Sequence, residues 1–221
     1  KYITLSEVDG SLSKNFVLVS NRLSDSFRDK VIVAGNQRVL RARLTDAEFF
    51  WRQDQARSLE SYLPDLSSVT FYKGLGTLHD KALRIEALAM VIAPYLDAVN
   101  PEIAGRAACL AKADLSTGLV GEFPELQGII GGYYAASSGE AKAVSIAITG
   151  HYRPQGPADD LPATPTAMVV ALADKVDTLV GFFGIGAKPT GSKDPFALRR
   201  AAFGVIRIIV DGKLNLPLAT V

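Results

Sequence analysis

The stretch ALADKVDTLVGFFGIGAKPTGSKDPFALRRAAFGVIR, residues 171–207, says more about the fold than any other part of the chain. It joins an apolar helix carrying Asp174 and Asp177, a glycine- and proline-rich turn with two lysines, and a second helix that opens near Asp194 and Pro195. Acidic side chains that can face a helical core thus precede a cationic loop and a helix start. This combination makes an anionic ligand, nucleic acid included, the first partner to consider.

Length and charge set broad limits on the molecule. With 221 residues, 48% of them hydrophobic, the chain can form one large globular domain or a medium domain with an appendage. Its formal net charge of +1 excludes a basic tail that binds RNA by bulk electrostatics. Any site for a polyanion must therefore be a local patch.

The single cysteine, Cys109, lies in an apolar run. One thiol excludes a disulfide framework and a cysteine-based zinc site, and it fits a reducing compartment, so we predict a cytoplasmic protein. No apolar run approaches the roughly 20 residues of a membrane span, and no signal peptide is visible, so no membrane partner is expected. Because the chain starts at Lys1 within strand-like sequence and stops at Val221, we expect a piece of a longer protein.

The N-terminal residues differ in pattern from the rest. Residues 2–20, YITLSEVDGSLSKNFVLVS, predict two short strands around a Val-Asp-Gly turn. We interpret residues 1–35 as a β-hairpin remnant and linker of an upstream domain. From Asn36 onward the periodicity is helical, so residues 36–215 predict a helical domain and the fold class is mainly α. Residues 216–221 would begin a further linker.

Periodicity, capping residues and prolines predict the helices. Leu40, Leu44 and Trp51 form one apolar stripe, which we expect to be buried against later helices. Asn100-Pro101 marks a helix start, because proline suits the first helical turn. The later predicted helical segments are residues 77–99, 102–120, 141–152, 165–183 and 195–210.

Acidic and histidine side chains recur on three of these helices. His79 lies on one, Asp114 on the next and Asp174 on a late one. Helices that each supply a histidine or aspartate to one interior resemble the HD-type metal phosphohydrolases, in which such ligands hold a divalent metal that activates water. The runs CLAKADL and LADKVDTL are similar to that family's ligand helices. We therefore expect an HD-domain-like helical bundle.

The same positions lack a full set of metal ligands. Ala113 stands where the paired histidine of that family belongs, and Lys81 lies close to the first ligand position, from which His79 is offset. A lysine beside a missing ligand opposes a cation. We predict no working metal site, and we treat Asp114 and Asp174 as degenerate ligand positions with His79 as a third candidate.

A structural role is the favoured alternative for the two aspartates. In this interpretation Asp114 and Asp174 cap or bridge helices through Lys112 and Lys175.

Residues 186–193, GAKPTGSK, nearly spell a phosphate-binding P-loop. That motif requires the order Gly-Lys-Ser/Thr, whereas Ser192 precedes Lys193 here. A P-loop also follows a buried strand, and Pro189 removes a backbone N–H donor. We therefore reject nucleotide binding by this loop.

A cationic cluster is the better interpretation of the same segment. Asp194 suits the N-cap of the helix that follows, and Arg200 and Arg207 share the outer face of that helix. Together with Lys188 and Lys193 they place positive charge beside a helix N-terminus, which suits phosphate contact. The alternative is a solvated face whose arginines pair with neighbouring acids.

Neither the second histidine nor the aromatic clusters predict catalysis. A lone histidine at a helix end, as at His151, is usually a cap or surface residue. Two histidines placed in this way support no Ser/His/Asp or Cys/His arrangement, so we predict no catalytic residue. Tyr133-Tyr134 and residues 49–51 could stack on bases, but their helical context favours core packing.

Five longer segments resemble one protein family. They are GNQRVLRARLTDAEFFWRQD, LGTLHDKALRIEALA, KADLSTGLVGEFPELQGIIGGYYA, LPATPTAMVVALADKVDTLVGFFGIG and PTGSKDPFALRRAAFGVIRI. Taken in order, from about Asn15 to Leu216, they are similar to the beta subunit of bacterial glycine–tRNA ligase.

This resemblance implies a role that the residues alone do not. In that family the alpha subunit carries the catalytic core, which uses ATP and Mg, and the beta subunit engages tRNA-Gly within an expected alpha2beta2 tetramer. The beta subunit has several domains, and residues 216–221 would lead to its C-terminal anticodon-binding domain. The resemblance implies that this chain is the HD-like section, with neither an active site nor a cofactor of its own.

Three functional hypotheses remain open. The leading one is a tRNA-docking or scaffold section of glycine–tRNA ligase. The rivals are an HD-type metal-dependent phosphohydrolase acting on a nucleotide or phosphoester, and a purely structural spacer. The residues expected to contact RNA phosphates are Lys188, Lys193, Arg199 and Arg200, followed by Arg38, Arg41 and Arg43.

Overall fold

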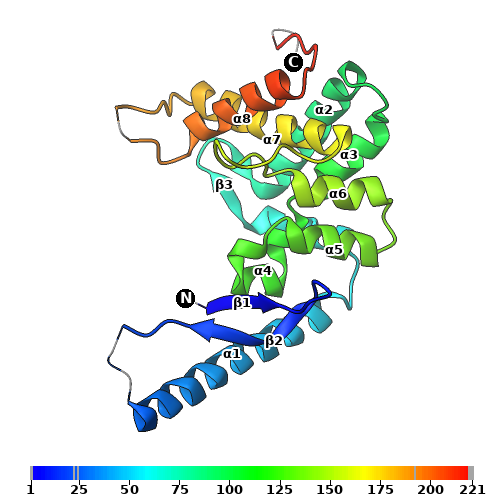
Figure 1. The fold of residues 1–221 in the computed structure, drawn as a ribbon. Helices are drawn as coiled ribbons and strands as arrows, with labels where there is room; N and C mark the ends of the chain where they lie inside the picture. The colour runs from blue at the N-terminus through cyan, green and yellow to red at the C-terminus, as the bar shows by residue number, and fades with distance from the viewer. Residues whose placement is uncertain (1, 22, 24, 192, 219–221) are drawn as a thin grey trace. The chain divides into compact units, whose positions relative to one another are not determined.

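The computed structural model describes residues 2–21, 23, 25–191 and 193–218. It is mainly helical, as predicted (Figure 1). The chain divides into two compact units, Lys1–Asp46 and Ala47–Val221. Within the described part of the chain, no helix is both long and apolar enough to cross a membrane.

The first unit contains the predicted β-hairpin. Strands β1 (Tyr2–Ser6) and β2 (Leu12–Leu18) pair antiparallel, with Tyr2 opposite Leu18. The turn between them uses Gly10 at φ 83°, a backbone conformation that glycine adopts without strain. Tyr2 donates a hydrogen bond to Asn36 Oδ1 at 3.0 Å, which ties the hairpin to the helix that follows.

Helix α1 (Ser26–Asp54) begins ten residues before the predicted start at Asn36. The carboxylate of Asp25 accepts a hydrogen bond from the Phe27 backbone N–H at 3.0 Å and so caps the first turn. The predicted boundary at residues 35–36 lies inside α1, and the compact units divide within the same helix. Leu44 is 62% exposed, so its predicted burial is wrong.

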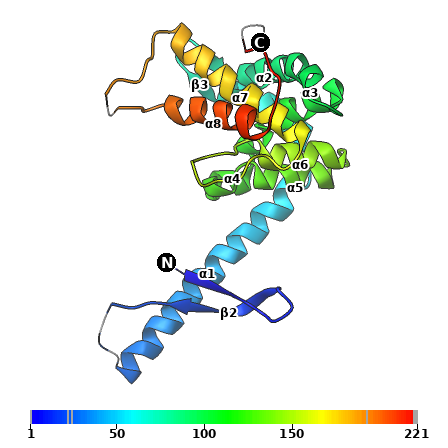
Figure 2. The same cartoon turned by 45° about the horizontal axis from the view of Figure 1, so that its top comes forward.

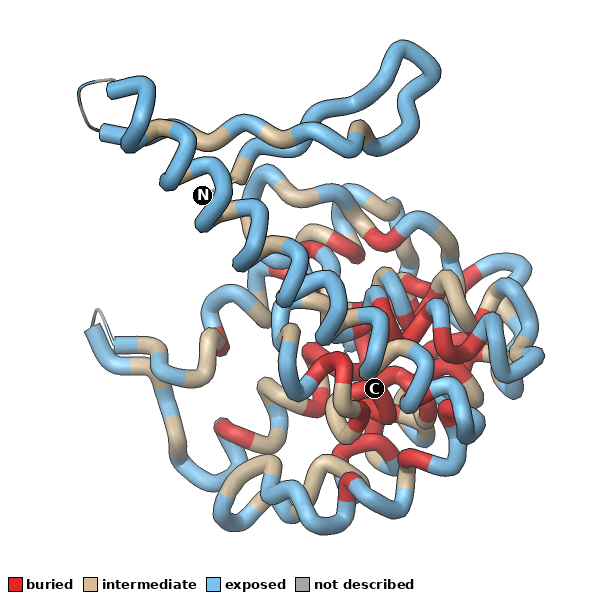
Figure 3. The backbone as a smooth tube through the Cα atoms, turned by 90° about the horizontal axis from the view of Figure 1, so that it is seen from below, coloured by how far each residue is buried: buried red, intermediate tan, exposed pale blue. Residues whose placement is uncertain are grey.

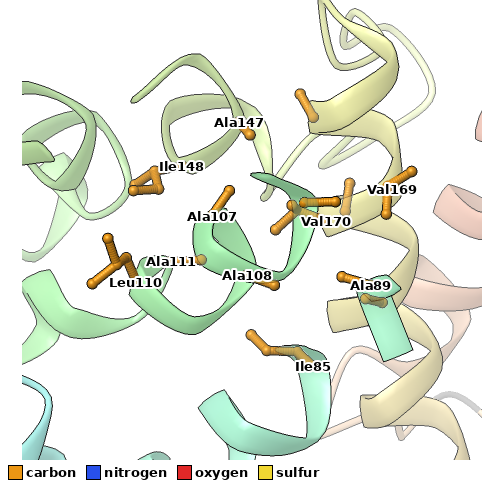
Figure 4. Packing of buried hydrophobic residues seen from close by; sticks show 14 of the residues in the cluster. Ile85, Ala89, Ala107, Ala108, Leu110, Ala111, Ala147, Ile148, Val169 and Val170 are labelled. Carbon is orange, nitrogen blue, oxygen red and sulfur yellow. The ribbon is translucent and has the colours of Figure 1, made fainter. Parts of the chain in front are cut away.

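The core lies in the second unit, where the buried positions gather (red in Figure 3). Helix α3 (Pro101–Leu110) is central, because it packs against α2 (Leu78–Ile92), α6 (Lys142–Gly150) and α7 (Pro165–Gly184). Figure 4 shows small side chains of α3, including Ala107 and Ala108, between residues of these neighbours. Alanines at these positions allow the helix axes to approach closely.

Local capping explains most of the helix starts. Thr77 and Asp80 form a reciprocal capping box at the start of α2. Asn100 accepts hydrogen bonds from the N–H groups of Glu102 and Ile103, which confirms the predicted start of α3. However, α2 ends at Ile92 rather than at residue 99, and the predicted helix 102–120 is broken into α3, a 3-10 turn and α4 (Gly118–Glu122).

Short elements complete the second unit. A small hairpin of β3 (Thr70–Tyr72) and β4 (Gly76–Thr77) precedes α2, and α5 (Ile129–Ser137) lies against α6. The 3-10 turns are Leu59–Tyr62, Pro64–Ser68, Ala93–Tyr95, Ala113–Ser116 and Pro124–Leu126.

Helix α8 (Leu198–Asp211) starts three residues later than predicted. Ala197 precedes it at φ 53°, and the predicted N-cap Asp194 acts from one turn further back. Its carboxylate accepts hydrogen bonds from Leu198 N at 2.8 Å and Arg199 N at 2.9 Å. Beyond α8, Leu216 is buried against the core, while residues 219–221 lie outside the described residues.

We predict that Gly132→Ala lowers the free energy of unfolding by about 1–3 kcal/mol, because α5 and α6 cross too closely there to admit a methyl group. A Cβ at Gly132 would lie 2.8 Å from the backbone oxygen of Ser145. Chemical denaturation measures the loss. Gly121→Ala in α4, where a Cβ meets no atom within 4 Å, is the matched control, and equal losses in the two variants would contradict the prediction.

Candidate functional site

Charged side chains are buried where α2, α3, α6 and α7 meet. Lys81 of α2, Lys112 after α3, His151 after α6, and Asp174 and Asp177 of α7 are all buried. We call these five residues the buried ionic cluster. Sequence periodicity placed the two aspartates inward, and the structure confirms this.

Asp174 is the centre of the cluster. Its Oδ1 lies 2.9 Å from Lys81 Nζ and its Oδ2 lies 2.9 Å from Lys112 Nζ. Lys81 donates its hydrogen bonds to Asp177, Thr178 and the Asp174 carbonyl, so its contact with Oδ1 is an ion pair alone. Burial by itself would raise the pKa of Asp174, but the charges of Lys112 and Lys81 outweigh it and hold the pKa well below its ordinary value.

His151 is a neutral member of the cluster. Its Nδ1–H donates to the carbonyl oxygen of Ile148 at 2.6 Å. Because an ammonium group can only donate, Nε2 must accept the 2.9 Å hydrogen bond from Lys112 Nζ. Burial and the charge of Lys112 lower the pKa of His151 well below 6.5. The predicted position at a helix cap is confirmed, since His151 is the C-cap of α6, but a surface position is wrong, because the side chain is fully buried.

The other predicted bridges take a different form. Lys175 forms no ion pair with an aspartate of the described residues; its Nζ donates to the carbonyl oxygens of His151, Tyr152 and Arg153 at 3.3, 3.2 and 2.9 Å. It thereby binds the chain that leaves α6. The favoured capping role is confirmed for Asp114, which accepts hydrogen bonds at the start of α5, whereas Lys112 forms its ion pair with Asp174 and not, among the described residues, with Asp114.

Asp114 Oδ2 accepts from the backbone N–H groups of Gly128 at 2.6 Å and Gly131 at 3.0 Å. Burial raises the pKa of Asp114, and these two hydrogen bonds oppose the rise. One buried carboxylate thus organises the first turn of α5.

The cluster does not fit a divalent metal. The positions facing both oxygens of Asp174 are taken by the ammonium groups of Lys81 and Lys112, which are donors and cannot ligate a cation. His79 forms no hydrogen bond or ion pair with Asp114 or Asp174 in the described part of the chain. Nor do three His, Cys, Asp or Glu side chains gather as ligands anywhere in that part. The hydrolase alternative is therefore not favoured.

The loop between α7 and α8 extends away from the helices in both views (Figures 1 and 2). It follows a helix rather than a strand, and Thr190 and Lys193 exchange backbone hydrogen bonds of 3.1 and 2.8 Å. The backbone N–H groups of Ala187 and Lys188 also donate hydrogen bonds to backbone oxygens. These N–H groups are thus not directed at a phosphate, while Ser192 lies outside the described residues.

Four predicted phosphate-binding side chains are exposed around this loop. They are Lys188 and Lys193 in the loop and Arg199 and Arg200 in the first turn of α8. No carboxylate of the described residues forms an ion pair with any of them. Arg207 differs, because it donates to Asp211 Oδ2 at 2.9 Å and to three backbone carbonyls. It therefore does not belong to the predicted cationic cluster around the loop.

The remaining predicted residues lie elsewhere. Arg38, Arg41 and Arg43 are exposed on α1 in the first unit. Core packing is confirmed for Tyr134, whose hydroxyl donates to Asp54 Oδ2 at 3.0 Å and whose ring lies 5.2 Å from that of Trp51.

Sequence reasoning missed Lys81 as a partner of Asp174 and His151 as a partner of Lys112. Each is separated from its partners by long stretches of chain, and the pairing depends on how the helices pack. The one available signal was the presence of lysines and a histidine within otherwise apolar helical patterns.

Comparison with known proteins gives one consistent family. The family model described as Glycyl-tRNA synthetase beta subunit matches residues 1–221. The chain is 51% identical to the glycine–tRNA ligase beta subunit of Pseudomonas entomophila over 100% of the chain and 32% of that relative. It is 54% identical to that of Phenylobacterium zucineum over 95% of the chain and 31% of that relative. The chain thus spans about a third of the length of the curated relatives it matches.

We predict that Asp174→Asn lowers the free energy of unfolding by about 3–5 kcal/mol, because two buried ammonium groups lose their shared counter-charge. Urea denaturation measures this loss. The control is Glu48→Gln, which removes an exposed i,i+4 partner of Arg52 and should have little effect. Similar values for the two variants would show that the cluster contributes no more than a surface pair.

We predict that acid weakens the fold through His151. The unfolded chain binds a proton on this histidine near pH 6.5, whereas the folded chain does not. The unfolded state therefore binds more protons below that pH, and stability falls as the pH decreases, by up to about 1.4 kcal/mol per pH unit. Denaturation from pH 7.5 to 5 measures the slope. It should flatten in His151→Gln and persist in His79→Gln, and equal slopes in the two variants would contradict the assignment.

Proposed function

The chain belongs to the glycyl-tRNA synthetase beta subunit family, and from this premise we propose that it is a section of the beta subunit of glycine–tRNA ligase. The whole enzyme would attach glycine to tRNA-Gly at the expense of ATP. This section would act as a tRNA-docking and scaffold module without its own active site. The observation that carries the proposal is the match of the entire chain to beta subunits at about half identity.

A scaffold role is supported by the chemistry of the buried ionic cluster. The two oxygens of Asp174 each lie 2.9 Å from a lysine ammonium group, and Asp177 is contacted by Lys81 and, at two points, by Arg84. Lys112 and His151 satisfy each other. Each carboxylate and the histidine of the cluster has a cationic partner within the fold, which supports a role of these charges in stabilising the packing of the helices.

The partners and cofactors of the whole enzyme follow from the same premise. The beta subunit would assemble with an alpha subunit, as an alpha2beta2 tetramer, and would bind tRNA-Gly. ATP and Mg would be used by the alpha subunit, and the complex would work in the cytoplasm, where proteins are synthesised.

The exposed cations between α7 and α8 are the proposed tRNA contacts. Lys188 and Lys193 lie on a loop that extends from the helical unit, and Arg199 and Arg200 follow at a helix N-terminus. Among the described residues no carboxylate forms an ion pair with these four side chains, so their charged groups are available for phosphate oxygens. Arg38, Arg41 and Arg43 on α1 form a second proposed contact.

We predict that Lys193→Glu and Arg200→Glu, introduced together into the full-length beta subunit bound to its alpha subunit, weaken tRNA-Gly binding. Each lost phosphate contact should reduce the slope of log affinity against log salt by about 0.7–0.9. Fluorescence anisotropy over a salt series measures both quantities. Lys142→Glu, an exposed lysine at the start of α6, is the control and should change neither.

The outcomes separate the two non-catalytic interpretations. Loss of affinity with a smaller slope supports tRNA docking by this loop. Unchanged affinity and slope would mean that the loop does not contact tRNA, and the section would then be a structural spacer unless the second proposed contact on α1 binds tRNA.

A further inference from the structure

Helix α8 presents one apolar face to the protein and another to solvent. Leu198, Val205 and Ile208 are buried, and the neighbouring helix against which α8 packs is α7. On the far side Phe203, Ile206 and Val210 are 40%, 57% and 65% exposed. Apolar side chains therefore occur both on the side of α8 that faces α7 and on the side that faces solvent.

The exposed residues form a continuous stripe. Arg199, Phe203, Ile206 and Val210 are spaced by four, three and four residues, so they follow one line along the helix. The solvent side of a surface helix is normally polar. Three large apolar side chains in line instead indicate an interaction surface.

The charges beside the stripe have one sign. Arg199 lies on the stripe at the N-terminal end of α8, Arg200 is next to it, and Lys213 follows the C-terminal end. Within the described ranges no carboxylate forms an ion pair with these three residues. The nearby carboxylate of Asp211 is held by Arg207 at 2.9 Å.

This combination fits a polypeptide better than an RNA. Phosphates would match the cations, but they would leave Ile206 and Val210 without an apolar partner. An amphipathic helix with aliphatic residues on one face and carboxylates at its borders would satisfy both features, as in helix-in-groove recognition. Charge complementarity therefore selects an acidic, amphipathic helix as the occupant.

We propose that the stripe Arg199, Phe203, Ile206 and Val210 is a protein-docking surface and that the alpha subunit supplies the helix that covers it. The inference rests on the proposed function, because an alpha subunit is the protein partner that a beta subunit implies. The docking surface adjoins the proposed tRNA contacts at Arg199. The alpha subunit and tRNA would then bind side by side at the start of α8.

The test is the affinity of purified alpha subunit for the full-length beta subunit that carries this chain. Ile206→Asp should weaken binding at least about tenfold, because it places a charge in the apolar centre of the contact. Ile206→Leu should retain binding. Leu83→Asp makes the same kind of change at a 49% exposed leucine of α2 and should bind like the unaltered subunit.

Thermal unfolding of each variant checks the fold. Should Ile206→Asp fail to fold, Val210→Ser tests the same stripe at a position that is 65% exposed. A loss of alpha-subunit affinity in the stripe variants, with none in Leu83→Asp, supports the proposal.

Other results would overturn it in distinguishable ways. If the unaltered beta subunit binds the alpha subunit and Ile206→Asp binds equally well, the docking surface is wrong and the proposed function stands. If the unaltered subunits do not bind at all, both fail. A beta-subunit dimer that Ile206→Asp dissociates in sedimentation would identify a second copy as the occupant, and loss of tRNA affinity alone would identify RNA.

Discussion

The carboxylate of Asp174 holds together the segments on which the helical unit depends. One oxygen contacts Lys81 of α2 and the other contacts Lys112 after α3, each at 2.9 Å. A buried charge is costly unless it is paired, and Asp174 pairs with both lysines, while Lys81 also pairs with Asp177. The apolar contacts of α2, α3 and α7 (Figure 4) supply attraction without strong direction, whereas the ion pairs require one relative position of the three segments.

The buried and the exposed charged side chains of the second unit have different roles. In the interior, Lys112 donates to both Asp174 and His151, and Lys175 is bound by three carbonyls. On the surface between α7 and α8, Lys188 and Lys193 form no ion pair with the described carboxylates. Charged groups that are already paired within the protein stabilise its fold, while charged groups without such a pair remain available to a binding partner. This difference is why we place binding on the loop and on α8 rather than at the buried ionic cluster.

Features with local causes could be predicted from the sequence. The hairpin follows from a Val-Asp-Gly turn, and the start of α3 follows from Asn100 and Pro101, because capping acts over three or four residues. The start of α1 has a local cause as well, the cap by Asp25, but the helical pattern was recognised only from Asn36 and the start was therefore predicted ten residues too late. The role of His151 was also missed, because its partner Lys112 is 39 residues away and only the packing of α3 and α6 brings them together.

Asp114 and Asp174 illustrate how neighbours decide what a carboxylate does. Lys81 and Lys112 bring two positive charges to Asp174, the same total charge as a divalent ion, which meets the electrostatic need of a buried carboxylate. Ammonium groups, however, provide no open coordination position and cannot polarise a water molecule as a metal does. Asp114, in turn, accepts backbone N–H groups and organises the start of α5. The same residue types that could support hydrolysis in other surroundings therefore support packing here.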